Sequence, residues 1–288
     1  LKKAGGAPAN VAAAIAALGG KVNMAAKVGK DPFGQHLIEL LQTMGVNTNW
    51  VLQDPNYFTT LAFVSLMEDG ERDFYFNRGA DGQLSPNDLT ALNISDYGIV
   101  HFGSATAFLP GPLQTTYTHL LAEAKSNNII VSFDPNYRHL LFQNNLQSFI
   151  EQCWPFIEQC HFFKLSEEEA LLITACNSVQ DAAAALRKKT SAVFAITLGK
   201  EGTLFSLEDH LEIIGSINIT PIDATGAGDA FVGAVLYQLI SYDPSQLSKI
   251  DLAEWKKIIF NANKAGARTC EYMGAMEAFK HLSKALFE

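Results

Sequence analysis

The alternation of strand-like and helix-like segments constrains the fold of this chain more than any other feature. Residues 98–104 are apolar and strand-like, residues 112–127 have a helical pattern, and residues 129–136 are again strand-like. A strand, a helix and a second strand in this order predict a βαβ unit with parallel strands. Strand-like segments at 21–29, 160–166 and 191–199 extend the pattern. The sequence therefore predicts an α/β fold in which helices flank a central, mostly parallel sheet.

Helix boundaries are marked by local signals. Asp31 precedes Pro32 at the start of a helical pattern, which predicts an N-cap followed by a proline in the first turn. The last third of the chain has helical patterns at residues 230–241, 252–269 and 276–286. We therefore expect the C-terminal third to be mainly helical.

One segment has a different periodicity. Residues 58–78 alternate with period two on both sides of Asp69-Gly70, which is a strong hairpin-turn signal. An antiparallel hairpin early in a parallel α/β chain suggests a lid, inserted at about residues 57–80. The alternative is an edge hairpin of the main sheet.

Composition limits the class of protein. The chain has 288 residues, of which 48% are apolar and 18% charged, so it fits one globular domain spanning residues 1–288. Its net charge of −9 argues against nucleic acid or an anionic membrane as the main partner. No apolar run approaches the ~18 residues of a membrane span. The four cysteines form no paired motif, which favours a cytoplasmic protein with reduced thiols.

A glycine-rich stretch, "DATGAGDAF" at residues 223–231, leads into a helical pattern. The N–H groups near Ala227, Gly228 and Asp229 would point outward without intrahelical partners, so they could bind an anion. The stretch lacks the lysine of a P-loop, and Phe231 stands where a dinucleotide-binding motif needs its third glycine. It therefore predicts an anion site of another kind.

Asp229 lies at this anion site. A carboxylate there would repel a phosphate, unless it faces a hydroxyl nucleophile whose proton it accepts during phosphoryl transfer. The helix N-terminus would keep Asp229 ionised and make it a weak base. The alternative is a simple N-cap.

Other glycines and polar residues stand at helix starts and strand ends. Gly5 and Gly6 precede Asn10 and an alanine-rich helix, where a ligand could approach the backbone and Asn10 could bond sugar hydroxyls. The alternative is a tightly packed helix start. Three further groups follow predicted strands: Asp134, Asn136 and Arg138; Lys164, Ser166 and Glu169; and Thr197, Gly199 and Gly202.

These strand ends have local alternatives as well. Asp134 could simply begin an Asx-Pro turn, and Ser166 with Glu169 has the spacing of a capping box. Ligands of open α/β sheets bind at the carboxyl ends of the strands. We therefore expect these groups to share one edge of the sheet.

Together, these motifs resemble the PfkB (ribokinase-like) family of carbohydrate kinases. "DATGAGDAF" is similar to the C-terminal signature of the family, and "GGAPANVA" with "GKDPFG" to its N-terminal signature region. The resemblance covers essentially the whole chain. It implies a ribokinase-like fold and ATP-dependent phosphorylation of a sugar, with Asp229 as the catalytic base. Gly226, Ala227 and Gly228 would form the anion hole for the transferring phosphate.

The resemblance also implies further site residues. Gly5, Gly6 and Asn10 match the sugar-binding positions. Glu169 would support Mg²⁺ through water, and Ser166 stands where the family usually has asparagine. The residues implied to bind the nucleotide are Lys164, Ser166, Glu169, Thr197, Gly199, Gly202 and Asn263, the last beside the adenine. Those implied to bind a monovalent cation such as K⁺ are Asp223, Thr225 and, through its backbone, Gly274.

Within the family, the strings "GGAPANVA", "ERDFYFNRGAD" and "FDPNYR" are most similar to those of bacterial fructokinases. Arg78 and residues 134–138 would then frame the sugar. Kinases of 2-keto-3-deoxygluconate and of aminoimidazole riboside have similar strings and remain alternatives. A non-catalytic sensor would be expected to lose Asp229 or the glycines, and an NAD-dependent dehydrogenase needs a G-x-G-x-x-G motif that is not found.

Two expectations concern the ends and the assembly. Family members begin with a strand whose aspartate binds the sugar, and nothing before Leu1 matches it, so we expect an N-terminal strand to be missing from this sequence. In many members the lid also pairs two subunits, which implies a possible homodimer.

Overall fold

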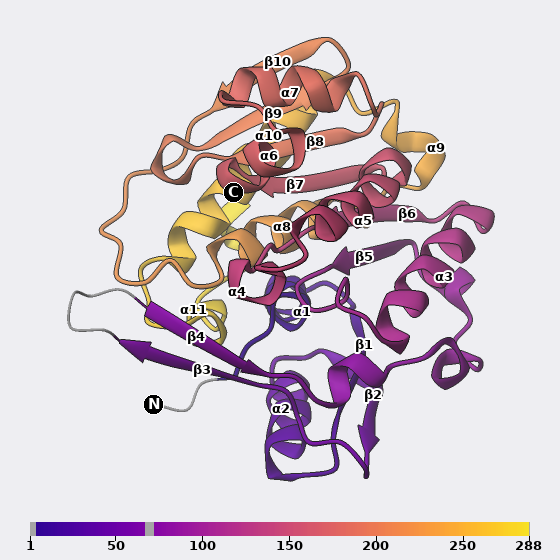
Figure 1. Cartoon of the computed structure of the whole chain (residues 1–288). Helices are drawn as coiled ribbons and strands as arrows, with labels where there is room; N and C mark the ends of the chain where they lie inside the picture. Colours follow the sequence, from indigo (N-terminus) through magenta and orange to yellow (C-terminus); the bar gives the residue numbers. More distant parts are fainter. Residues whose placement is uncertain (1–3, 67–71, 288) are drawn as a thin grey trace.

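A six-stranded sheet forms the centre of the computed structural model, which describes residues 4–66 and 72–287 (Figure 1). The strand order is β10-β9-β8-β7-β6-β5. Four strands are parallel: β5 (Ile99–Gly103), β6 (Ile130–Asp134), β7 (Phe162–Ser166) and β8 (Val193–Thr197). Strands β9 (Thr203–Leu207) and β10 (His210–Ile214) are antiparallel to their neighbours. The prediction of a mostly parallel central sheet is confirmed.

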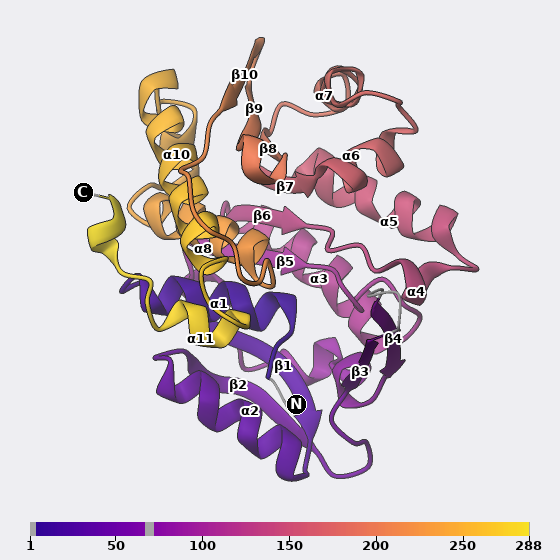
Figure 2. The ribbon, with the colours of Figure 1, turned by 90° about the vertical axis from the view of Figure 1, so that its left-hand side faces the viewer.

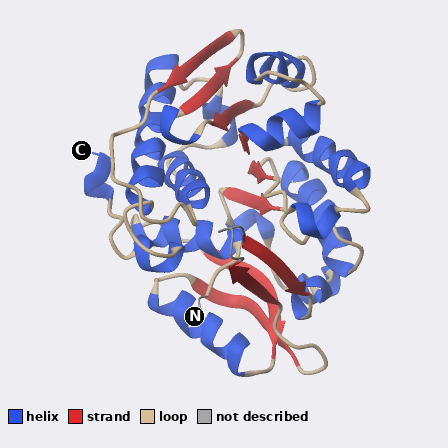
Figure 3. Cartoon of the chain, turned by 60° about the vertical axis from the view of Figure 1, so that its left-hand side comes forward, coloured by secondary structure: helices blue, strands red, loops and turns tan. Residues whose placement is uncertain are grey.

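Helices cover both faces of this sheet (Figures 1, 2 and 3). Alternate strand side chains enter two separate cores: Ile130 and Phe162 face one layer, Val131 and Phe163 the other. The first layer contains α1 (Ala7–Ala17), α8 (Ala227–Leu239), α10 (Leu252–Thr269) and α11 (Ala275–Phe279). The second contains α3 (Pro112–Ser126), α5 (Leu146–Gln159), α6 (Glu167–Thr174) and α7 (Val179–Arg187). The central parallel strands β6, β7 and β8 are buried on both faces, as parallel strands usually are, whereas the edge strand β10 is partly exposed.

The βαβ unit is formed by β5, α3 and β6, as predicted, with β5 and β6 parallel. Helix α2 (Pro32–Thr43) begins as predicted, because the Asp31 carboxylate accepts hydrogen bonds from the N–H groups of Phe33 (2.9 Å) and Gly34 (2.8 Å). Short helices α4 (His139–Phe142) and α9 (Pro244–Leu247) connect larger elements.

Two smaller two-stranded sheets are hydrogen-bonded separately from the central sheet. Strands β1 (Asn23–Gly29) and β2 (Asn47–Asp54) form a parallel pair. Strands β3 (Leu61–Leu66) and β4 (Arg72–Asn77) form an antiparallel pair. Within the described residues, β3 and β4 pair only with each other, so the alternative of an edge hairpin of the main sheet is wrong. The predicted turn at Asp69-Gly70 lies outside the described residues.

The C-terminal helix predicted at residues 276–286 is wrong. Helix α11 ends at Phe279, and a short 3₁₀ helix spans Lys284–Phe287. The apolar spacing fits one longer helix, but tertiary contacts interrupt it: the His281 ring stacks on Tyr272 with centroids 3.9 Å apart, and the Leu286 carbonyl accepts a bond from Lys264. No helix in the described part of the chain combines the length and apolar character that a membrane crossing requires.

Candidate active site

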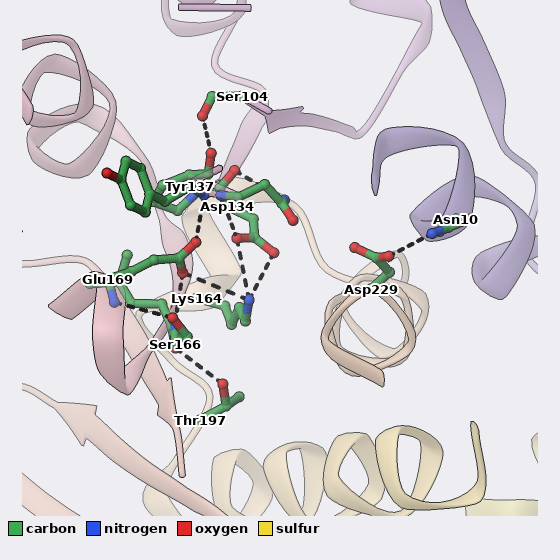
Figure 4. A network of polar contacts seen from close by, with 12 residues as sticks. Asn10, Ser104, Asp134, Tyr137, Lys164, Ser166, Glu169, Thr197 and Asp229 are labelled. Atoms are coloured by element: carbon green, nitrogen blue, oxygen red, sulfur yellow. Dashed lines mark hydrogen bonds and ion pairs between the residues drawn. The ribbon is translucent and has the colours of Figure 1, made fainter. Parts of the chain in front are cut away.

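Polar residues at the carboxyl ends of β6, β7 and β8 lie at one edge of the central sheet (Figure 4). Asp134 ends β6, Ser166 ends β7 and Thr197 ends β8. These strands are parallel neighbours, so their carboxyl ends meet at the same edge. The predicted shared edge is confirmed for these three strands.

Asp229 lies in the first turn of α8 and faces α1 (Figure 4). Its carboxylate accepts a hydrogen bond of 2.8 Å from the Asn10 side-chain amide, and only 8% of its surface is exposed. Gly226 occupies the N-cap of α8, which has no side-chain cap. The alternative of a simple Asp229 N-cap is therefore wrong, and the carboxylate is directed toward the space shared by the two helices.

Burial raises the pKa of Asp229 to about 6. The hydrogen bond from Asn10 and the charges of Lys164 and Arg138 oppose this rise, whereas the charge of Asp134 adds to it. With this pKa, Asp229 is still mostly ionised at neutral pH, as predicted, but burial makes its carboxylate a stronger base than a solvent-exposed aspartate. A carboxylate with this pKa is well matched to accept a proton near neutral pH.

Lys164 is a buried cation among three carboxylates. Its ammonium lies 3.2 Å from the nearer oxygen of Asp134 and 4.0 Å from that of Glu169. Burial alone would lower the pKa of Lys164, but the charges of Asp134, Glu169 and Asp229 together raise it. The lysine therefore stays charged and stabilises a cluster of carboxylates that water could not solvate.

Glu169 and Ser166 form the capping box that we considered as an alternative. Ser166 Oγ accepts a bond of 3.1 Å from the Glu169 N–H, and the Glu169 carboxylate accepts one of 2.7 Å from the Ser166 N–H. The other oxygen of Glu169 accepts a bond of 2.8 Å from the Tyr137 N–H. Glu169 thus ties the start of α6 to the turn after Asp134.

The turn after Asp134 also has the local structure considered as an alternative. The Asn136 N–H donates to the Asp134 carboxylate (3.3 Å), and Asn136 has a left-handed backbone with φ 49°. Arg138 is exposed and donates to the Tyr137 carbonyl at 3.0 Å. Sequence reasoning missed Ser104. Its hydroxyl donates to the Pro135 carbonyl, and its N–H donates to the backbone carbonyl of Asp134 (3.0 Å). Its position directly after β5 is the signal that could have identified it.

The glycines of the two signatures have different surroundings. Gly226 has φ 85°, and a Cβ there would overlap that of Ala275. A Cβ on Gly228 would lie 3.2 Å from the Lys164 ammonium. Gly5 and Gly6 are exposed, and nothing lies within 4 Å of a Cβ on either. Close packing therefore does not account for Gly5 and Gly6 among the described residues, although α1 itself begins at the buried Ala7.

Asp223, Thr225 and Gly274 are brought together as predicted. One oxygen of Asp223 accepts bonds from the Thr225 N–H (3.0 Å) and hydroxyl (2.6 Å), and the other accepts one of 2.8 Å from the Gly274 N–H. Carboxylate and hydroxyl oxygens are hard donors that suit a monovalent cation. Within residues 4–66 and 72–287, no three His, Cys, Asp or Glu side chains are grouped as metal ligands.

The predicted nucleotide residues of the β8–β10 region have partners within the protein. Thr197 donates to the Leu165 carbonyl (3.3 Å), and Gly199 has φ 60°. Gly202 has φ 100°, and a Cβ there would overlap the Ile214 carbonyl, so its lack of a side chain already has a structural reason.

Asn263 likewise holds the end of β10. Its amide donates to the carbonyls of Ile214 (2.8 Å) and Gly215 (3.1 Å), while its oxygen accepts from the Thr203 hydroxyl (2.7 Å). Both ends of this side chain are engaged in the protein. A role beside an adenine therefore stays a prediction and would depend on packing rather than on free amide groups.

Arg78 follows β4, and its contacts lie away from the Asp134–Lys164 pair. Its guanidinium donates to the carbonyls of Pro110 (2.8 Å) and Thr106 (3.1 Å) and lies 3.7 Å from the Asp81 carboxylate. The predicted contact with a sugar remains a prediction.

Comparisons with known proteins agree with this geometry. The model of the pfkB family carbohydrate kinase matches residues 1–282. Fructokinase-1 of Zea mays is 36% identical over 281 residues, which cover 96% of this chain and 85% of that protein. Fructokinase-1 of Oryza sativa subsp. japonica is 35% identical over the same shares of the two chains.

Two solved structures are similar over the whole chain. Fructokinase from Vibrio cholerae O395, with fructose, ADP and calcium ion bound, has a TM-score of 0.87 at 30% identity and covers 100% of this chain and 91% of that one. Fructokinase from Xylella fastidiosa, with bound ATP, has a TM-score of 0.91 at 28% identity, with coverage of 100% and 90%.

Proposed function

The chain belongs to the pfkB family of carbohydrate kinases and is an ATP-dependent sugar kinase, and we propose that the sugar is fructose. The observation that carries this proposal is the Asn10–Asp229 pair. Within the described residues, the side-chain oxygen of Asn10 is buried without a hydrogen-bond partner, while its amide donates to Asp229. A sugar hydroxyl would satisfy this oxygen and lie beside the carboxylate.

The proposed reaction is in-line transfer of the terminal phosphoryl group of ATP to a hydroxyl of fructose, the 6-hydroxyl in preference to the 1-hydroxyl. Asp229, with a pKa of about 6, is mostly ionised at neutral pH and accepts the hydroxyl proton. The Ala227 N–H already donates to the Ala224 carbonyl at 3.2 Å, contrary to the prediction that it has no partner. The N–H of Gly228 would face the transferring phosphoryl group and stabilise its charge. Lys164, below Gly228, adds a positive charge to the same region.

Mg²⁺ would accompany the nucleotide, and Glu169 would hold it through water. When bound, it neutralises phosphate charge during transfer. The residues fit this indirect role, because both Glu169 oxygens already accept backbone N–H bonds but retain free lone pairs.

We propose K⁺ for the loop of Asp223, Thr225 and Gly274, because an ion there would fix the loop that leads into α8. Potassium should therefore raise the rate above that in a large organic cation at equal ionic strength. Equal rates in the two salts would contradict this assignment. An Asp223→Asn variant should respond less to potassium than the wild type.

The proposed substrate is tested by comparing kcat/KM for fructose and for 2-keto-3-deoxygluconate at saturating ATP. An acid sugar would need a cation for its carboxylate. The Arg78 guanidinium already donates to two carbonyls, which leaves the exposed Arg138 for such a group. We expect fructose to be preferred, because the similar proteins are fructokinases. If kcat/KM for the acid sugar is at least tenfold higher than for fructose, the proposed substrate is wrong and the acid sugar takes its place.

We also propose that the β3–β4 side forms a homodimer. Phe33, Tyr57 and Phe58 are exposed near it by 40%, 45% and 45%. An isolated two-stranded pair is marginal in water, so a second copy packed there would stabilise it. A protein that sediments as a monomer at micromolar concentration would contradict this assembly.

A further inference from the structure

The carboxylate of Asp81 joins three segments of the chain. One oxygen accepts the hydroxyl of Thr60, directly before β3. The other accepts a bond of 2.6 Å from the hydroxyl of Thr106, in the loop after β5. Arg78, directly after β4, lies 3.7 Å from this second oxygen. One side chain therefore links both arms of the β3–β4 pair to the loop beyond the central sheet.

The two arms are also held directly to each other. The Gly79 N–H donates to the Thr60 hydroxyl (2.8 Å), and the Ala80 N–H donates to the Phe58 carbonyl (2.9 Å). A Cβ on Gly79 would overlap the Phe58 carbonyl, so the backbones approach as closely as glycine allows. Because the Thr60 hydroxyl accepts from Gly79, its own proton is available for Asp81.

The loop after β5 continues this network into the active site. Thr106 follows Ala105, a non-glycine residue with φ 24°, a conformation that costs energy and is retained only where the surroundings impose it. Before it, the Ser104 N–H donates to the Asp134 carbonyl at 3.0 Å. Asp134 in turn pairs with Lys164. Hydrogen bonds and this short turn thus connect the β3–β4 arms to the buried ion pair.

A carboxylate suits this position better than an amide would. Asp81 accepts hydrogen bonds from two hydroxyls and forms an ion pair with Arg78, and it offers no proton of its own when ionised. Asparagine has nearly the same shape but would direct an amide group at one of these donors. The bonds to a charged acceptor are also stronger than those to a neutral one.

We propose that Asp81 is a positioning residue for phosphoryl transfer, a role that rests on the proposed function. It fixes the β3–β4 strands to the turn at Ala105, so that the lid and the Asp134–Lys164 edge are held in one arrangement around the sugar. Without it, the sugar is held less firmly, and water competes with the sugar hydroxyl for the phosphoryl group.

The test compares Asp81→Asn with Asp88→Asn. Asp88 is a matched control, because its side chain is 25% exposed against 24% for Asp81. It also pairs with a cation, Lys27, and accepts a hydrogen bond from a hydroxyl, that of Ser85. In Asp81→Asn we expect a rise of about tenfold in KM for the sugar, the size of one lost charge-assisted bond, with KM for ATP unchanged. ATP hydrolysed per sugar phosphorylated should also rise. Asp88→Asn should change neither quantity.

Thr106 provides a second pair of variants. Thr106→Val breaks only the link between Asp81 and the turn, so it should reproduce the change in sugar KM and in hydrolysis, whereas Thr106→Ser should restore wild-type values. If Asp81→Asn lowers the melting temperature but leaves the ratio of hydrolysis to sugar phosphorylation at the wild-type value, the positioning role is wrong.

Hydrogen exchange on the protein without substrates separates this inference from the proposed function. Asp81→Asn should increase exchange at residues 58–60, 78–81 and 104–107, and Asp88→Asn should not. A wild-type protein that phosphorylates no sugar would contradict the proposed function. The exchange data would still show whether Asp81 connects the β3–β4 arms to the loop after β5. Unchanged exchange at residues 104–107 in Asp81→Asn would overturn the proposed positioning role of Asp81.

Discussion

Helices α1 and α8 pack against each other and begin in the same way, yet the glycines at their starts have different surroundings. Each has a glycine N-cap with positive φ, 124° at Gly6 and 85° at Gly226, and neither has a side-chain cap. Their first turns meet in the hydrogen bond between Asn10 and Asp229. The space around Gly6 is open, whereas the space around Gly226 is filled by Ala275.

The two helix starts show two different reasons why a position is occupied by glycine. At Gly226 the chain itself requires glycine, because the backbone conformation and the contact with α11 both exclude a side chain. At Gly5 no atom of the described residues requires it, since none lies within 4 Å of a Cβ and its φ is not in the left-handed region. Gly226 therefore shapes the backbone at the start of α8, and the glycines before α1 leave room beside it.

The largest expected effect is on the α8 side. Asp229→Ala should lower kcat by at least ~10²-fold, the low end for loss of a general base. Binding of ATP should change little, because the N–H groups of α8 remain. Isothermal titration with ATP and steady-state kinetics measure the two quantities.

A suitable control is Asp251→Ala, which removes an N-cap of α10 that accepts from the Glu254 N–H. It should cost stability, ~1 kcal/mol, and leave kcat unchanged. An Asp229→Ala enzyme that keeps more than a tenth of the wild-type kcat would contradict the assignment of the base.

The glycine comparison predicts opposite outcomes for two alanine substitutions. Gly226→Ala should destabilise the protein by about 2–3 kcal/mol, because of the strained φ and the overlap with Ala275. Gly5→Ala should change stability by less than ~0.5 kcal/mol but raise KM for the sugar. Thermal denaturation and kinetics of both variants check this. A Gly5→Ala enzyme with an unchanged sugar KM would mean that the sugar does not use this space.

The smallest expected effect is a shift in the pH profile when the hydrogen bond between Asn10 and Asp229 is removed. Asp229 must be ionised to accept a proton, so kcat/KM should fall as the pH drops through about 6. The hydrogen bond from Asn10 lowers the pKa of Asp229, so Asn10→Ala should move this acidic limb to higher pH. Asn261→Ala, which removes a buried asparagine bound to Gln238 instead, is the matched control. Superimposable pH profiles of Asn10→Ala and wild type would show that the limb belongs to another group.

Local signals in the sequence predicted much of the fold. Asp31 with Pro32 marked the start of α2, and three of the parallel strands ended where polar residues followed apolar runs. The stretch at residues 223–231 predicted a glycine-rich helix start with Asp229 in its first turn. These features depend on neighbours within a few residues, which is why the sequence alone carries them.

The strand β10 and the break after α11 could not be predicted in this way. Strand β10 pairs only with β9 among the described strands, and the C-terminal break depends on contacts such as the stack of His281 on Tyr272. The partners of Arg78 likewise come from a loop about 30 residues away in the chain.

By itself, then, the sequence determined the α/β alternation, the caps and the signature that places Asp229 at a helix start. Only the tertiary structure decided the strength of that base. Asn10 lies 219 residues from Asp229 in the chain, and Asp134 and Lys164 reach its surroundings from two different strands. The pKa of a carboxylate depends on its burial and on the charges around it, and both exist only after these distant segments have packed together.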